Sequence, residues 1–257
     1  MTFSLTYKLY GERSILIEWP SFIQDDILFD LLHFKDLIHL NGLKHIKEIR
    51  SAYNSLLVVY DKKLRAYDEE IKVLNAIYKT TSISKKTYNS RLWKIPVCYD
   101  AQFAFDIEAL SKSKKIPIDE IIKRHTNVIY RVCFIGFLPG FLYLSGLHET
   151  LFTPRKATPR LKVEKGAVAI GGNQTGIYPI ESPGGWHVIG NSPIPFFNPK
   201  QDSPCFAKAG DQVQFYSIDI EAYNHIKNLV KNLPAIRQPL IPSLSNTYVL
   251  FLTKFLM

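Results

Sequence analysis

Glycine and proline are concentrated in one stretch of the chain, which limits the folds that this stretch can adopt. Ten of the 13 glycines lie between Gly136 and Gly190, with several prolines among them. The intervening apolar runs are short and comprise residues 168–170, 177–180 and 186–190, with a further run at 212–217. Short strands separated by Gly/Pro turns are typical of a closed β-barrel or a sandwich.

The first 80 residues show a different pattern, in which strand-like and helix-like segments alternate. Within residues 22–40, apolar side chains recur at spacings of three and four, which places them on one face of a helix. We therefore predict a small N-terminal α+β sandwich domain over residues 1–80, with helices on one face of a sheet. Its strands are expected at 3–10, 14–19, 44–53 and 55–60, and its helices at 22–40 and 65–78.

A polar, basic segment at residues 79–90 separates this domain from a second one, which we place at residues 91–230. The second domain is predicted to contain strands at 92–99 and 130–137, helices at 107–113, 118–125 and 220–230, and the Gly/Pro-rich strands. Residues 231–257 form a tail that prolines interrupt repeatedly, so we expect it to be dispensable for folding.

The composition excludes several classes of protein. Hydrophobic residues make up 46% of the chain and charged residues 21%, which is unlike a disordered chain. The formal net charge of +9 arises from dispersed residues, so we expect a basic surface and no nucleic-acid site. The N-terminus does not resemble a secretory signal, and no apolar run approaches the ~20 residues that span a bilayer.

The three cysteines, Cys98, Cys133 and Cys205, are far apart and form no C-x-x-C pair. This spacing argues against a zinc ribbon or a disulfide framework and suits a reducing compartment. We therefore expect a cytoplasmic protein that does not associate with membranes.

Three ordered motifs lie within the Gly/Pro-rich part. They read GFLPGFLYLSGL at residues 136–147, TPRKATPR at 153–160 and GGNQTGIYPIESPGGWHVIG at 171–190. Together they resemble the PxpB/KipI family, the B subunits of 5-oxoprolinase, also labelled allophanate hydrolase subunit 1. Residues 11–17, 95–99 and 125–126 fit the same pattern, so the resemblance extends from near the N-terminus to about residue 225.

The resemblance implies a fold and a choice of functions. The implied fold is an N-terminal α+β domain followed by a C-terminal cyclophilin-like β-barrel domain. The first implied function is that of the B subunit of 5-oxoprolinase, a hydrolase of a cyclic amide, which with the PxpC/KipA-like C subunit phosphorylates 5-oxoproline using ATP. The separate A subunit then opens the ring to glutamate. The alternatives are a KipI-type inhibitor of a sensor histidine kinase and the carboxyltransferase part of urea carboxylase.

Basic side chains in the second motif are candidates for catalysis. Arg155, Lys156 and Arg160 lie within six residues of a segment that contains two prolines, and Arg and Lys suit the carboxylate of 5-oxoproline and the phosphates of ATP. A solvated charged loop is the alternative interpretation. His187 is a candidate acid or base, with a structural role as the alternative, and Glu181 is the nearest candidate carboxylate.

Polar groups beside glycines are candidates for binding substrate or nucleotide. They are Asn173, Gln174, Thr175, Gly184 and Gly185, and turn formation is the alternative for each. One carboxylate does not make a metal site, so we expect no metal held by the chain itself, although ATP is expected to bring Mg. The chain contains neither a P-loop nor a G-x-G-x-x-G motif, so the sequence leaves open which component of the complex binds ATP.

An apolar group in the first motif is the candidate surface for a partner protein. It consists of Phe137, Phe141 and Tyr143, and core packing beneath the barrel mouth is the alternative. Because the chain lacks a nucleotide motif and carries this group, we expect it to be inactive without the C subunit.

Overall fold

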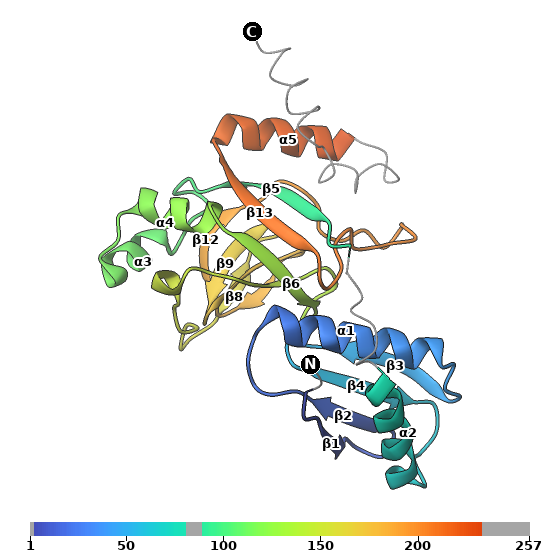
Figure 1. Cartoon of the computed structure of the whole chain (residues 1–257). Coiled ribbons are helices and arrows are strands. Elements are labelled where there is room, and N and C mark those ends of the chain that lie inside the picture. Colours follow the sequence, from blue (N-terminus) through green and yellow to red (C-terminus); the bar gives the residue numbers. More distant parts are fainter. Residues whose placement is uncertain (1–2, 81–88, 233–257) are drawn as a thin grey trace. The chain divides into compact units, whose positions relative to one another are not determined.

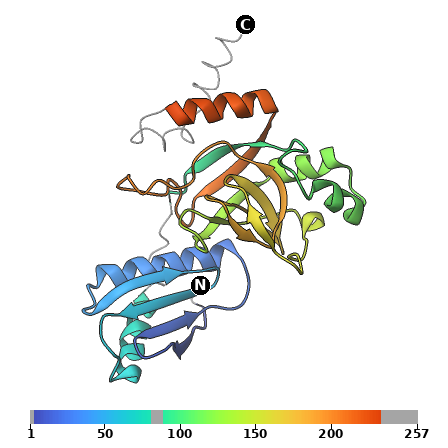
Figure 2. The same cartoon turned by 180° about the vertical axis from the view of Figure 1, so that it is seen from behind.

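The computed structural model describes residues 3–80 and 89–232, and the chain divides into two compact units, residues 1–89 and 90–257. Figure 1 and Figure 2 show the helices and strands of both units from opposite sides. The predicted α+β fold with a closed barrel is confirmed. The predicted tail lies outside the described residues from residue 233 onward.

The N-terminal unit is a four-stranded antiparallel sheet with two helices on one face. Its sheet order is β1-β2-β4-β3. Alternate residues of β2 and β4, such as Ile15 and Val58, are fully buried, which is the period expected of a sheet covered on one side. The bounds are β1 Thr6–Leu9, β2 Ser14–Glu18, α1 Asp25–Leu40, β3 Ile46–Ser51, β4 Ser55–Tyr60 and α2 Tyr67–Thr80.

The second unit is built on a closed seven-stranded barrel with the order β10-β7-β6-β13-β5-β12-β9. Strands β5 and β13 run parallel, and the other neighbouring pairs are antiparallel. The barrel strands are β5 Leu92–Cys98, β6 Ile129–Ile135, β7 Leu142–Ser145, β9 Ala167–Gly171, β10 Gln174–Ile177, β12 His187–Asn191 and β13 Gln212–Ile218. A separate ribbon pairs β8 Arg160–Val163 with β11 Ser182–Gly184.

Three helices pack against the barrel. Helix α3 (Ile107–Lys114) contacts α4 (Ile118–Thr126) and β12, while α4 also contacts β13. The last helix, α5 (Ile220–Asn232), follows β13 and packs against β5 (Figure 1). None of the helices within the described ranges is long and apolar enough to cross a membrane.

The barrel strands bury apolar side chains on both of their faces. Val168 and Ile170 of β9 belong to the interior core, whereas Ala167 and Ala169 of the same strand belong to a second cluster on the outside. Strand β7 alternates in the same way. A strand face that is open to solvent normally carries polar side chains, so the apolar outer face of this barrel must be covered by other side chains.

Candidate functional site

Aromatic rings cover the outer face of β7, β9, β10 and β12. We call Phe141, Tyr143, Tyr178 and Trp186 the outer aromatic cluster. The ring centroid of Phe141 lies 5.1 Å from that of Tyr178 and 5.6 Å from that of Trp186, and both pairs are nearly perpendicular. Edge-to-face pairs of this kind stabilise a cluster beyond the area that they bury.

Two strand glycines make room for this cluster. A Cβ atom on Gly171 would lie 2.5 Å from the Trp186 ring, and one on Gly176 would lie 2.9 Å from the Phe141 ring. These glycines therefore serve the packing of aromatic rings against the sheet, a use that glycine within a strand often indicates.

Arg155 lies at the exposed side of the outer aromatic cluster. Its guanidinium carbon is 5.6 Å from the centroid of the Trp186 ring, which is a cation–π contact. Burial raises the pKa of Tyr143, and the positive charge of Arg155 acts in the opposite direction. The Tyr143 hydroxyl is therefore protonated at neutral pH and can donate a hydrogen bond beside the guanidinium.

Lys156 and Arg160 of the same loop point instead to a buried carboxylate. Arg160 donates two hydrogen bonds to Asp106, of 2.6 and 2.7 Å, and the Lys156 ammonium lies 2.8 Å from the same carboxylate. The backbone N–H of Val188 donates to Asp106 at 2.7 Å. Burial acts to raise the pKa of Asp106, but these donors outweigh it and leave the pKa below its ordinary value.

The backbone of the loop is attached on both sides of Arg155. Thr153 and Gly172 exchange two backbone hydrogen bonds, of 2.9 and 2.7 Å. The N–H of Lys156 donates to the Gly185 carbonyl at 2.7 Å, and His187 Nε2–H donates to the Pro154 carbonyl at 2.9 Å. Arg155 therefore extends from a backbone that is held at the residues before and after it.

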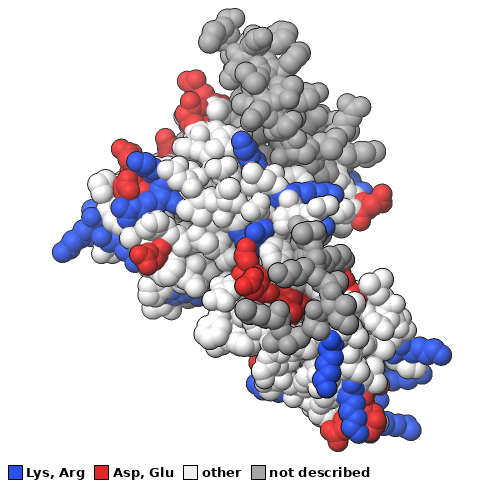
Figure 3. All heavy atoms as spheres, viewed as in Figure 1, with Lys and Arg blue, Asp and Glu red and all other residues white. Residues whose placement is uncertain are grey.

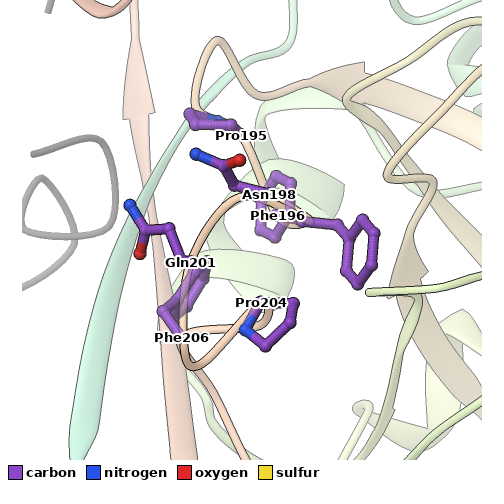
Figure 4. Close-up of a pocket in the computed structure, with 7 residues that line it drawn as sticks. Pro195, Phe196, Asn198, Gln201, Pro204 and Phe206 are labelled. Carbon is purple, nitrogen blue, oxygen red and sulfur yellow. The ribbon is translucent and has the colours of Figure 1, made fainter. Parts of the chain in front are cut away.

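Charged side chains outside this loop are dispersed. On the face shown in Figure 3, Lys and Arg lie in separate groups, with Asp and Glu nearby. In residues 3–80 and 89–232, no three His, Cys, Asp or Glu side chains gather closely enough to hold a metal ion. A small hollow lies between residues 195 and 206 and is lined by none of the predicted site residues (Figure 4).

Comparisons with known proteins place the chain in a family. Residues 5–207 match the model of the carboxyltransferase domain, subdomain C and D. The chain belongs to this family. Its resemblance to the B subunit of 5-oxoprolinase, indicated by the three motifs, is confirmed by relatives of that name.

Two of these relatives illustrate the sequence identity and the share of each chain that is matched. It is 42% identical over 139 residues to the 5-oxoprolinase B subunit of Bacillus subtilis (strain 168), covering 54% of this chain and 58% of that protein. It is 45% identical over 134 residues to the 5-oxoprolinase B subunit of Haemophilus influenzae, covering 52% of this chain and 63% of that protein. Each match thus spans less than two thirds of the relative.

The fold of the carboxyltransferase-domain chain also occurs in a much larger enzyme. The crystal structure of the K. lactis urea amidolyase superposes with a TM-score of 0.76 at 19% identity. The match covers 88% of this chain and 16% of that protein. At this identity the similarity concerns the fold alone.

Several of the predicted site residues lie in or beside the outer aromatic cluster or contact the loop that carries Arg155. Phe141 and Tyr143 belong to the outer aromatic cluster, and Phe137 is 61% exposed at its rim, 5.6 Å from Phe141 between ring centroids. Gly185 accepts a hydrogen bond from the loop, and Gly184 lies against the Tyr178 hydroxyl, where a Cβ would come within 2.3 Å. His187 holds the loop, so the structure gives it a positioning contact.

The remaining predicted residues are distributed differently. Asn173 is exposed in the turn between β9 and β10, and Gln174 lies on the same outer face as Gly176. Thr175 is fully buried inside the barrel, where it contacts His125 and the Ala169 carbonyl. Glu181 forms an exposed ion pair of 2.9 Å with Lys162.

Sequence reasoning missed Asp106, Tyr178 and Trp186 as members of the site. Asp106 immediately precedes helix α3 but makes no side-chain hydrogen bond to the helix; its carboxylate instead contacts residues 50 and 54 positions away, which no local pattern indicates. The order Trp186-His187 indicated a strand but not which side the indole faces. The substrate roles assigned to Lys156 and Arg160 stay predictions, and the contact with Asp106 gives both a structural role as well.

Proposed function

We propose that this chain is the B subunit of an ATP-dependent 5-oxoprolinase and that it phosphorylates 5-oxoproline together with the C subunit on the way to glutamate. The family match and the relatives named as 5-oxoprolinase B subunits support the assignment. The observation that carries it is the position of Arg155, a cation exposed beside a cluster of aromatic rings. An exposed guanidinium complements the carboxylate of 5-oxoproline.

The chemistry explains why a phosphoryl donor is needed. The lactam carbonyl of 5-oxoproline is a poor electrophile, because its nitrogen donates electrons into the carbonyl group. Transfer of the γ-phosphoryl group of ATP to the lactam oxygen forms a C–O–P linkage and releases ADP. Water then adds to the same carbon and the ring C–N bond breaks, with a proton passing to the nitrogen, which leaves an acyl phosphate. A second water displaces the phosphate, so that glutamate and inorganic phosphate are formed. The A subunit is proposed to carry out the opening of the ring.

A partner protein is part of this proposal. Arg155 and Phe137 are exposed on the outside of the barrel, so a second protein surface is needed to enclose the reaction from water. We propose that the C subunit supplies this surface, and that ATP with Mg binds within the assembled complex.

The test is reconstitution from the purified proteins. The chain alone is expected to show no ATP hydrolysis that depends on 5-oxoproline, the mixture with the C subunit is expected to show it, and addition of the A subunit is expected to yield glutamate. Full activity of the chain alone would refute the partner requirement. A stable mixture that hydrolyses no ATP when 5-oxoproline is added would refute the proposed function.

A further inference from the structure

The three cations of the loop 153–160 differ in what they contact. Asp106 is 3% exposed and receives both Lys156 and Arg160. Arg155 is exposed and forms no ion pair with any carboxylate of residues 3–80 and 89–232; its described contact is with the Trp186 ring. Of the three loop cations, Arg155 is therefore the one whose charge the described structure leaves uncompensated.

The contact with Trp186 leaves the guanidinium able to bind an anion. A cation–π contact uses the flat face of the guanidinium, whereas its N–H donors point outward in the plane of the group. Two of these donors can bind the two oxygens of one carboxylate or phosphate at the same time.

The attachment of the loop determines where these donors lie. The side chain of Asp106 holds Lys156 and Arg160, and the backbone N–H of Asp106 donates to the Val188 carbonyl at 2.9 Å, next to His187. A buried carboxylate held by two cations and a backbone N–H has little freedom to move. It connects the start of α3, strand β12 and the loop, and so it limits the positions open to Arg155.

We propose that Arg155 binds the carboxylate of 5-oxoproline and that Asp106 is the positioning residue that holds Arg155 there. This proposal rests on the proposed function and adds to it the group that recognises the substrate. The same guanidinium chemistry also suits a phosphate of ATP, so the experiment must distinguish the two anions.

The first arm measures kinetics of the reconstituted complex with 5-oxoproline and with 2-pyrrolidinone, the same lactam without its carboxylate. Arg155→Gln is expected to raise the KM for 5-oxoproline about 10- to 150-fold, the range typical of a hydrogen-bonded charged contact, and to leave the KM for ATP and the reaction of 2-pyrrolidinone unchanged. Lys94→Gln, at an exposed site on β5, is the control and is expected to match the wild type. A rise in the KM for ATP instead would overturn the carboxylate assignment.

The second arm tests Asp106. Asp106→Asn is expected to raise the KM for 5-oxoproline in the wild-type background and to add no further increase in the Arg155→Gln background, because it acts through Arg155. A purely structural role would lower kcat, or the active fraction, equally in both backgrounds. That result would overturn the positioning role.

The third arm does not depend on enzymatic activity. The full chain contains three tryptophans, so a ¹H–¹⁵N spectrum shows three indole signals, and Trp186→Phe identifies one of them. Arg155→Gln and Asp106→Asn are both expected to shift the Trp186 signal, and Lys94→Gln is not. If Asp106→Asn leaves the signal in place, the positioning role is wrong even where the complex is active. If the wild-type complex does not use 5-oxoproline while the signal shifts as expected, it is the proposed function that fails.

Discussion

Mild acid is expected to destabilise the barrel through His125, which is fully buried on helix α4. Thr175 donates its hydroxyl hydrogen to the Ala169 carbonyl at 3.0 Å, so its oxygen must accept the 3.0 Å hydrogen bond from His125 Nε2–H. His125 Nδ1 then accepts from the Tyr99 hydroxyl at 2.7 Å. In this arrangement Nε2 carries the single ring proton of a neutral imidazole and Nδ1 is an acceptor. A second proton on Nδ1 would have no acceptor opposite it.

The size of the effect follows from the pKa of His125. Burial lowers this pKa from 6.5 to about 3 in the folded protein. Below pH 6.5 the unfolded chain therefore binds one more proton than the folded chain, and stability is lost as the pH falls from 6.5 toward 3. At ~1.4 kcal/mol per pH unit, the loss reaches about 2 kcal/mol at pH 5, or roughly 4–8 °C in Tm for a domain of this size.

The assay is thermal unfolding between pH 7.5 and 5, followed by tryptophan fluorescence. In a Trp19→Phe background the remaining tryptophans, Trp93 and Trp186, both belong to the barrel unit. His125→Gln is expected to lower stability at pH 7.5 but to abolish the His125-dependent loss of Tm in acid. His225→Gln, at an exposed site on α5, is expected to retain that loss. If wild type and His125→Gln lose stability in parallel, burial of a neutral His125 is not the cause.

Substitutions at Phe137 and Gly171 also test the outer face of the barrel. Phe137 has a φ of 63° in a γ-turn that is closed by the 2.7 Å hydrogen bond from Leu138 N–H to the Gly136 carbonyl. Because glycine adopts this backbone conformation without strain, the Phe137→Gly variant should be about 1–2 kcal/mol more stable than Phe137→Ala. Both variants are expected to lower the activity of the complex. Equal urea midpoints for the two variants would show that the turn holds no strain. Gly171→Ala is expected to lower the free energy of unfolding by about 1–3 kcal/mol and to raise the KM for 5-oxoproline by displacing Trp186. Gly185→Ala is the control: a Cβ there would have its nearest neighbour 3.6 Å away, so stability should change little. A wild-type Tm for Gly171→Ala would contradict the close packing of Trp186 on β9.

The architecture was largely predictable from local patterns in the chain. Alternating apolar residues in β2 and β4 have the period of a strand, and the three- and four-residue spacing in α1 has the period of a helix. The Gly/Pro spacing indicated short strands in a barrel or a sandwich, and the structure contains a barrel. These properties depend on neighbours within a few residues, so the sequence by itself determines them.

The membership of the site depended on contacts between distant segments. Lys156 and Arg160 were as suitable for an anion as Arg155 until the fold brought Asp106 to them from about 50 residues away. Thr175 and Gln174 are adjacent in sequence, yet one contacts His125 inside the barrel and the other lies on the outer face. A strand pattern determines that successive side chains alternate, but the pairing of β10 with β7 and β9 decides which set faces inward, because a shift of one residue would exchange the two faces.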